Sequence, residues 1–121
     1  MIRWTAAGLL LAGAAYAQQP GQPDAWLPRT TAELVVLDKV RAQPTPLTVR
    51  VGQSATVGSL TIAVRGCVVR PPDMAQDSAA FLEVTDPRAS GSAFRGWMLA
   101  GAPALSQLEH PLYDLRVTSC H

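Results

Sequence analysis

The sequence predicts an all-β domain, a small antiparallel sandwich or partly open barrel of about seven strands with one short helix. Two observations support this fold class: short segments in which apolar and polar residues alternate, and brief turns rich in Gly or Pro between them. The clearest segment is 59–72, where Leu60, Ile62 and Val64 share one parity. Because successive side chains of a strand point to opposite faces, this pattern is typical of a strand with one buried face.

The remaining strands follow from the same alternation and from β-branched residues. A turn around Pro44 is expected over 41–45, and one short helix is expected between Gly101 and Pro111, because Pro103 suits a first helical position and Pro111 prevents continuation. The seven expected strands lie within 31–40, 47–51, 55–57, 59–70, 80–85, 94–100 and 113–120.

The first 17 residues have the features of a secretory signal peptide. Arg3 provides a positive charge, 6–15 is apolar and rich in small residues, and Ala15-Tyr16-Ala17 offers a cleavage site before Gln18. The apolar run is shorter than the roughly 20 residues that span a bilayer. We therefore expect a cleaved signal peptide, a periplasmic location, and no membrane span after cleavage.

The rest of the chain is expected to comprise a flexible leader over 18–31, rich in Pro, Gln and Gly, and a single β-domain over 32–121. Without Arg3, nine basic side chains remain against nine acidic ones. A neutral domain of this kind lacks the basic patch that a nucleic-acid partner needs.

The two cysteines, Cys67 and Cys120, both lie in the predicted domain. Two cysteines in an exported chain usually form a disulfide, so we expect this pair, with Cα atoms closer than about 7 Å. Strand parity places both cysteines on the wetter faces of their strands, which predicts a bond outside the main apolar layer. A bulge at Gly66 would reverse that parity for Cys67.

His110 is the only plausible general base, because His121 is expected to be frayed. It follows Glu109 and precedes Asp114, with Ser106 in the expected helix. The sequence has no Gly-x-Ser-x-Gly turn to present a nucleophile, so a catalytic triad is not expected. The simpler interpretation is that His110 and Glu109 close the helix. No cofactor motif, metal-ligand cluster or zinc spacing is present either.

A possible binding surface consists of aromatic and basic side chains, namely Trp97, Arg95, Arg70, His110 and Tyr113. Trp97 shares parity with Arg95 and Leu99, so it is either a core anchor or part of a binding platform. The sequence thus favours a non-catalytic module that binds an envelope protein or another ligand. The alternative is a small periplasmic hydrolase or enzyme inhibitor with a site near His110.

Several short segments are informative when taken together. They are Val51-Gly-Gln53, Gly58-Ser-Leu60, Cys67-Val-Val-Arg-Pro-Pro72, Ala80-Phe-Leu-Glu83, Gly96-Trp-Met98, Ala104-Leu105 and Leu108-Glu-His-Pro111 with Tyr113-Asp114. In this combination the chain resembles a family of small exported bacterial proteins, the domain-of-unknown-function family 2155. The resemblance covers about 34–120, and it implies export and a Cys67–Cys120 pairing but no catalytic residues.

Overall fold

The computed structural model describes residues 26–89 and 93–121. The expected signal peptide and most of the expected leader lie outside these residues. The elements, in chain order, are β1 (Leu27–Pro28), β2 (Thr31–Asp38), β3 (Gln43–Arg50), β4 (Ser54–Val57), β5 (Leu60–Val69), β6 (Ser78–Thr85), β7 (Phe94–Leu99), the 3-10 turn η1 (Pro103–Leu105) and β8 (Tyr113–Cys120).

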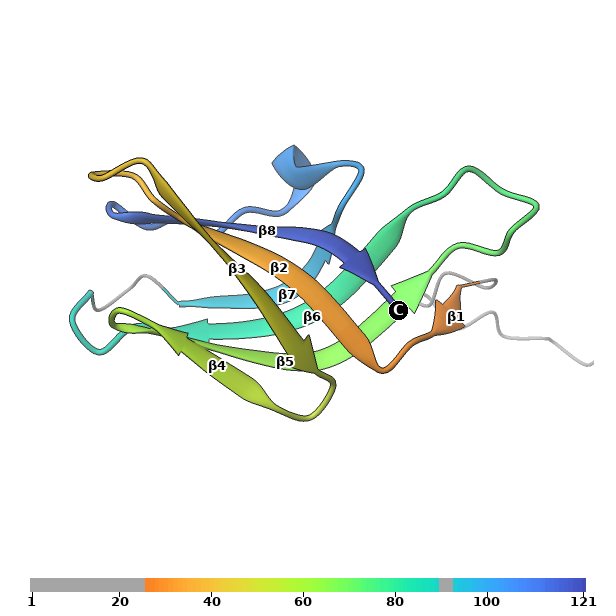
Figure 1. Ribbon diagram of the computed structural model, residues 1–121, viewed down its shortest axis with the longest axis horizontal. Coiled ribbons are helices and arrows are strands. Elements are labelled where there is room, and N and C mark those ends of the chain that lie inside the picture. Colours follow the sequence, from red (N-terminus) through yellow and green to blue (C-terminus); the bar gives the residue numbers. More distant parts are fainter. Residues whose placement is uncertain (1–25, 90–92) are drawn as a thin grey trace, which may run out of the picture.

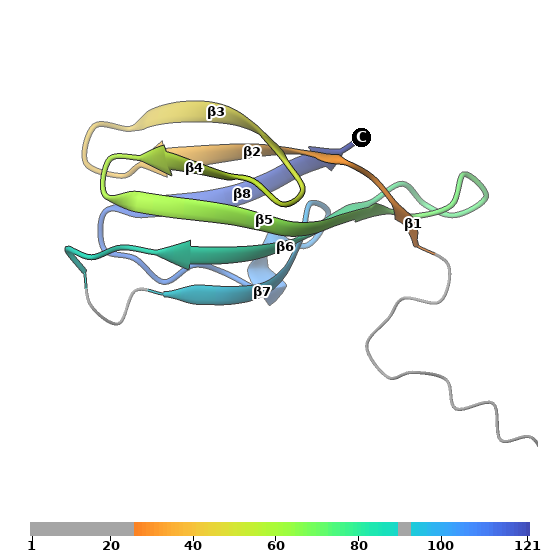
Figure 2. The same cartoon turned by 90° about the horizontal axis from the view of Figure 1, so that it is seen from below.

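Two antiparallel sheets pack face to face, which confirms the all-β prediction (Figures 1 and 2). Sheet A has the order β1-β5-β6-β7, and β4 also pairs with β5; sheet B has the order β3-β2-β8. In the described part of the chain the sheets remain separate and form no closed barrel.

Alternate residues of the central strands fill the space between the sheets. Leu34 and Val36 of β2 face Leu60 and Ile62 of β5 and Leu82 of β6 across a single core in which these five side chains are fully buried. The predicted parity of the first half of β5 is therefore confirmed. Burial of these side chains is the main favourable contribution to folding.

Two bulges reverse the predicted parity of both cysteines. In β5 the register with β6 shifts between Val64 and Gly66, which leaves Arg65 as an extra residue. In β8 the register with β2 shifts so that Thr118 is extra. Because one inserted residue turns all later side chains to the opposite face, Cys67 and Cys120 point into the core and are 2% and 7% exposed.

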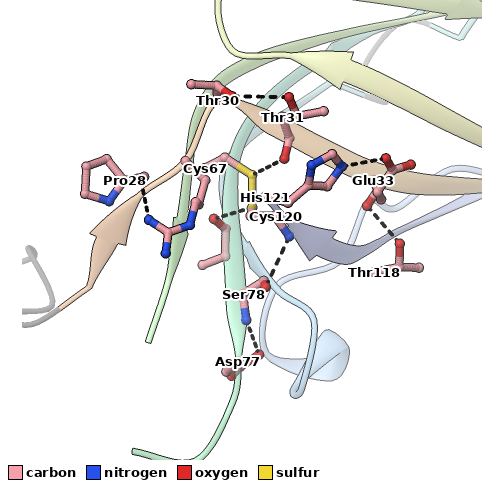
Figure 3. The surroundings of a disulfide bond; sticks show 12 residues. Pro28, Thr30, Thr31, Glu33, Cys67, Asp77, Ser78, Thr118, Cys120 and His121 are labelled. Atoms are coloured by element: carbon pink, nitrogen blue, oxygen red, sulfur yellow. Dashed lines mark hydrogen bonds and ion pairs between the residues drawn. A yellow bond between two sulfur atoms is a disulfide. The ribbon is translucent and has the colours of Figure 1, made fainter. Parts of the chain in front are cut away.

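The Cys67–Cys120 disulfide therefore joins sheet A to sheet B from inside the sandwich, with Cα atoms 5.8 Å apart (Figure 3). The predicted Cα separation agrees with this value, but the expected position outside the apolar layer is wrong. His121 is not frayed, because its backbone N–H donates to the Thr31 carbonyl and its carbonyl accepts from the Thr31 N–H.

Two local predictions also differ from the structure. The expected turn around Pro44 is part of β3, where Pro44 and Pro46 are tolerated because β3 is an edge strand. The expected helix is only the η1 turn, and Ser106 follows it in extended conformation. Pro103 does begin the turn, but no side chain caps it.

Candidate functional site

His110 and Asp86 form a buried pair at the end of the sandwich where β8 begins. Nε2 of His110 lies 2.7 Å from Oδ2 of Asp86, and the two side chains are 0% and 1% exposed. Nδ1 of His110 accepts hydrogen bonds from the backbone N–H groups of Leu112 and Tyr113, at 3.0 and 3.2 Å. Because Nδ1 accepts, its proton resides on Nε2, which donates to Asp86.

Asp86 accepts two further hydrogen bonds, from the Ser59 hydroxyl to Oδ2 and from the Arg88 N–H to Oδ1, each at 2.8 Å. Burial raises the pKa of Asp86, but the hydrogen bonds from His110, Ser59 and Arg88 outweigh burial and hold that pKa below its ordinary value. The carboxylate is therefore anionic near neutral pH and fully hydrogen-bonded.

This arrangement differs from a Ser-His-Asp triad in its connectivity. In a triad, the histidine takes the proton of the serine, whereas here Ser59 donates directly to Asp86 and both nitrogens of His110 are occupied. Glu109 is exposed, and His110 does not end a helix as expected. The network instead ties together three connections, because Ser59 precedes β5, Asp86 follows β6 and His110 precedes β8.

Tyr113 supports the same end of the fold. The centroid of its ring lies 5.1 Å from that of the His110 ring, and the ring planes form an angle of 55°. The Tyr113 hydroxyl occupies the position that a Cβ atom on residue 58 would take. Gly58 has φ of +57°, so this turn requires glycine for both its backbone conformation and its lack of a Cβ. Of the two residues, His110 is buried and Tyr113 is partly buried.

Trp97 lies on the outer face of sheet A and remains 38% exposed. Its ring meets Phe81 edge to face, with centroids 5.4 Å apart, and a Cβ on Gly66 would approach it to 3.2 Å. The glycine at the β5 bulge therefore provides space for the indole. Met98, the next residue, is buried on the opposite face.

Charged side chains surround this aromatic pair. Glu83 binds Arg65 at 3.4 Å and Arg95 at 3.2 Å, and the Arg95 guanidinium lies over the Phe81 ring at 5.8 Å. We call the group Arg65, Phe81, Glu83, Arg95 and Trp97 the Trp97 platform. Sequence parity predicts that Trp97 and Arg95 share a face, but it does not predict Phe81 or Arg65, because no local signal gives the cross-strand register.

Arg70 lies apart from the platform, with its guanidinium 5.2 Å from the centroid of the Trp26 ring. The five residues predicted as a binding surface are therefore divided among three places. Arg95 and Trp97 lie together beside Phe81, His110 and Tyr113 lie together where β8 begins, and Arg70 lies beside Trp26. The sequence analysis did not identify Asp86, which binds His110, or Ser59, which donates to Asp86, because both are distant from His110 in the sequence.

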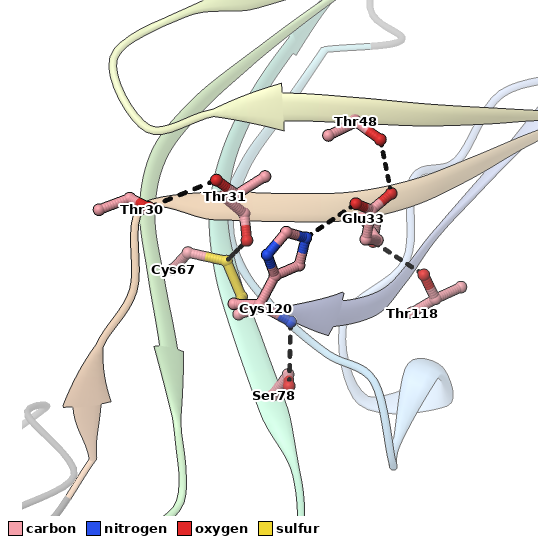
Figure 4. Close-up of polar contacts among 9 residues, drawn as sticks. Thr30, Thr31, Glu33, Thr48, Cys67, Ser78, Thr118 and Cys120 are labelled. Carbon is pink, nitrogen blue, oxygen red and sulfur yellow. Dashed lines mark hydrogen bonds and ion pairs between the residues drawn. A yellow bond between two sulfur atoms is a disulfide. The ribbon is translucent and has the colours of Figure 1, made fainter.

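A second histidine–carboxylate pair lies at the opposite end of the sandwich. His121 Nε2 is 2.9 Å from Oε1 of Glu33, and the Thr48 hydroxyl donates to Oε2 at 2.7 Å (Figures 3 and 4). Hydrogen bonds from His121 and Thr48 lower the pKa of Glu33 despite partial desolvation. Thr118 donates to the Glu33 carbonyl at 3.0 Å.

A hollow with several polar lining residues lies between η1 and β8 and has a volume of about 270 Å³. Lys39, Gln107, Asp114 and Arg116 are among its lining residues. Lys39 Nζ already donates to the His110 carbonyl at 2.9 Å.

Across residues 26–89 and 93–121, no three His, Cys, Asp or Glu side chains gather as metal ligands. Within the same ranges, no helix combines the length and apolar character that crossing a membrane requires.

The fold and its central covalent link define a small β-sandwich domain whose two sheets are joined by a buried disulfide. A family model described as "Uncharacterized protein conserved in bacteria (DUF2155)" matches residues 32–120, so the chain belongs to this family, as its resemblance predicted.

A curated relative is an uncharacterised protein of Rickettsia prowazekii (strain Madrid E), which is 23% identical over 94 residues. The match covers 75% of this chain and 61% of the length of that relative. No solved structure matches the chain.

Proposed function

We propose that this chain is an exported, non-catalytic binding module that contacts an envelope partner through the Trp97 platform. The observation that carries the proposal is the position of Trp97 on the outer face of sheet A, where 38% of it is exposed. Tryptophan and arginine contribute most often to the energetic centre of protein interfaces. Phe81 and Gly66 support the indole in a fixed orientation, which reduces the entropy lost on binding.

Export is supported by the disulfide. Structural disulfides persist in oxidising compartments such as the bacterial periplasm and are rare in the cytosol. The Cys67–Cys120 bond is buried between the sheets, which favours a structural role for it. The apolar segment over 6–15 and the cleavage site at Ala15-Tyr16-Ala17 are the features of a secretory signal peptide, which would direct the chain to the export machinery.

A hydrolase or inhibitor with a site near His110 has less support. Both ring nitrogens of His110 already have partners, and its side chain has no exposed surface. A general base must reach the proton that it abstracts. The geometry of His110 instead favours a role in holding the loops of the domain.

Site-specific photocrosslinking in the periplasm tests the binding proposal. A photoreactive residue replaces either Thr85, which is exposed beside the Trp97 platform and follows Glu83 on β6, or Thr118, which is exposed on β8 of sheet B. We expect a reproducible adduct from position 85, reduced by Trp97→Ala, and none from position 118. Equal adducts at both positions, or none at either, would contradict the proposal.

The export part is tested separately by fractionation and mass spectrometry of the intact protein. We expect a periplasmic protein that begins at Gln18 and contains no free thiol. A cytosolic protein that retains Met1 would refute export, and the crosslinking experiment in the periplasm would then give no adduct at either position.

A further inference from the structure

Most edge strands of the two sheets have features that prevent another strand from adding to them. β1 and β4 are only two and four residues long, and β3 contains Pro44 and Pro46. Short strands and prolines are common protections of sheet edges.

The edge of β8 is protected by side chains. The N–H groups of Tyr113, Leu115 and Cys120 donate to the side chains of His110, Asp114 and Ser78, respectively. These donors are therefore not available to an added strand.

β7 differs from all of these edges. It runs for six residues without proline, and its pairing with β6 shows no register shift. The Ala100 N–H donates to the Ser78 carbonyl of β6, so alternation directs the backbone groups of Arg95, Trp97 and Leu99 away from β6. Among the described residues, none forms a hydrogen bond with the outward N–H groups of these three.

We infer that an extended segment of a partner protein adds to the outer edge of β7 as a further antiparallel or parallel strand. Evenly spaced backbone donors and acceptors are matched by another extended polypeptide, which is the chemistry of β-strand addition. The inference rests on the proposed function, because the added segment would lie against the Trp97 platform.

The charges and shape near β7 indicate what this segment carries. Glu83 is shared by Arg65 and Arg95, so the platform has one positive charge in excess and suits an acidic side chain. A hollow of about 450 Å³, lined in part by Val84, Phe94 and Arg95, is large enough for an apolar side chain of the segment.

A second copy of this chain suits the edge less well. Two β7 strands would bring two positively charged platforms together, and like charges across neighbouring strands destabilise their pairing. We therefore assign the edge to an acidic, extended segment of a different protein.

Peptide selection followed by edge-blocking variants tests this inference. The full-length, oxidised protein is used to select binders from a display library of random linear peptides, and selected peptides are synthesised. We expect peptides in which acidic and apolar residues alternate. Their binding should slow hydrogen exchange at the N–H groups of Arg95, Trp97 and Leu99.

Leu99→Pro and Leu99→Ala form the matched pair. Both remove the leucine side chain, but only proline removes the outward N–H, and edge positions tolerate proline. We expect Leu99→Pro to weaken peptide binding about tenfold relative to Leu99→Ala, as loss of one backbone hydrogen bond implies. The melting temperature and absence of free thiol confirm that each variant is folded.

The remaining outcomes separate this inference from the proposed function. If Trp97→Ala abolishes binding but Leu99→Pro equals Leu99→Ala, the platform binds its ligand without strand addition and the inference is wrong. Failure to select any peptide also overturns it, although partner crosslinking at position 85 can still succeed. Sedimentation gives a third outcome. If the wild-type protein is a dimer and Leu99→Pro is a monomer, then a second copy of this chain binds the β7 edge, and the inference of a different partner protein is wrong.

Discussion

The two ends of the sandwich each contain a histidine–carboxylate pair, and the two pairs differ chiefly in burial. At one end, His110 and Asp86 are 0% and 1% exposed, and every polar atom of the two side chains has a partner. At the other end, His121 and Glu33 are 64% and 32% exposed. The Nε2–oxygen distances, 2.7 and 2.9 Å, are nearly the same.

The comparison shows that distance alone does not determine what such a pair contributes. A buried group that loses its partner keeps the cost of its desolvation, whereas an exposed group regains water. The exposed end is held by the Cys67–Cys120 disulfide, which lies beside His121. The end at His110 has no covalent link and depends on its hydrogen bonds.

Removal of the disulfide should have the largest effect. Cys67→Ala combined with Cys120→Ala should lower the free energy of unfolding by about 4 kcal/mol, from the chain entropy of a loop closed across 53 residues. Urea denaturation measures the change. Reductant should destabilise the wild-type protein to a similar extent and leave the double variant unaffected; an equally stable double variant would contradict a structural role for the bond.

Loss of His110 should have the next largest effect. His110→Ala removes one of the three hydrogen bonds that the buried Asp86 carboxylate accepts, and it leaves the N–H groups of Leu112 and Tyr113 without their acceptor. The melting temperature should fall by more than about 10 °C. Glu109→Ala, at the exposed neighbouring position, is the control and should change it by no more than about 2 °C. A fall of similar size in both variants would show that burial does not distinguish them.

Acid should destabilise both ends, and the buried end more strongly. Hydrogen bonds lower the pKa of Asp86 from 3.8, against the effect of burial, and those from His121 and Thr48 lower that of Glu33 from 4.5. A lowered folded-state pKa contributes stability that is present above the unfolded value and lost as the pH falls through the folded value. Stability should therefore decrease below about pH 4.5.

Denaturation midpoints measured across that acidic range should become less dependent on pH in Asp86→Asn, and only slightly less so in Glu33→Gln. Unchanged acid dependence in Asp86→Asn would mean that another carboxylate controls it.

His121→Ala should have the smallest effect. Exposed ion pairs contribute little because water and salt screen them, so the melting temperature should change by less than about 3 °C. The pKa of Glu33, measured by NMR titration, should move up towards its ordinary value once the hydrogen bond from His121 is lost. The matched variant Thr48→Ala should raise it by a smaller amount. If His121→Ala lowered the melting temperature more than His110→Ala, the exposed pair would stabilise the fold more than the buried pair, and the comparison would be wrong.

The sequence predicts the strands well because alternation is a local property. Leu60, Ile62 and Val64 face the core as their parity indicates. Parity fails beyond Gly66 and beyond Thr118, where one extra residue in each strand depends on the pairing with the neighbouring strand. Glycine at position 66 gives a signal for the first bulge, and nothing around Thr118 gives one for the second.

The candidate sites depend even more on tertiary structure. His110 is identifiable as a residue of interest, but its partner Asp86 is 24 residues away and its burial follows from the packing of three connections. Pro44 and Pro46 predict a turn because the sequence does not show that β3 lies at an edge. Parity assigns Trp97 to a face, but its contacts with Phe81 and Gly66 depend on the cross-strand register, which no local pattern gives.

The pairing of β2 with β8 has a consequence for how the chain folds. Ala32 pairs with Cys120, which lies 88 residues further along. The hairpin of β2 and β3 is local and can form early, but the other edge of β2 has no partner until β8 pairs with it. Long-range pairing of this kind forms slowly, so the folding chain exposes this edge of β2 until a late step and is most prone to aggregation before that step.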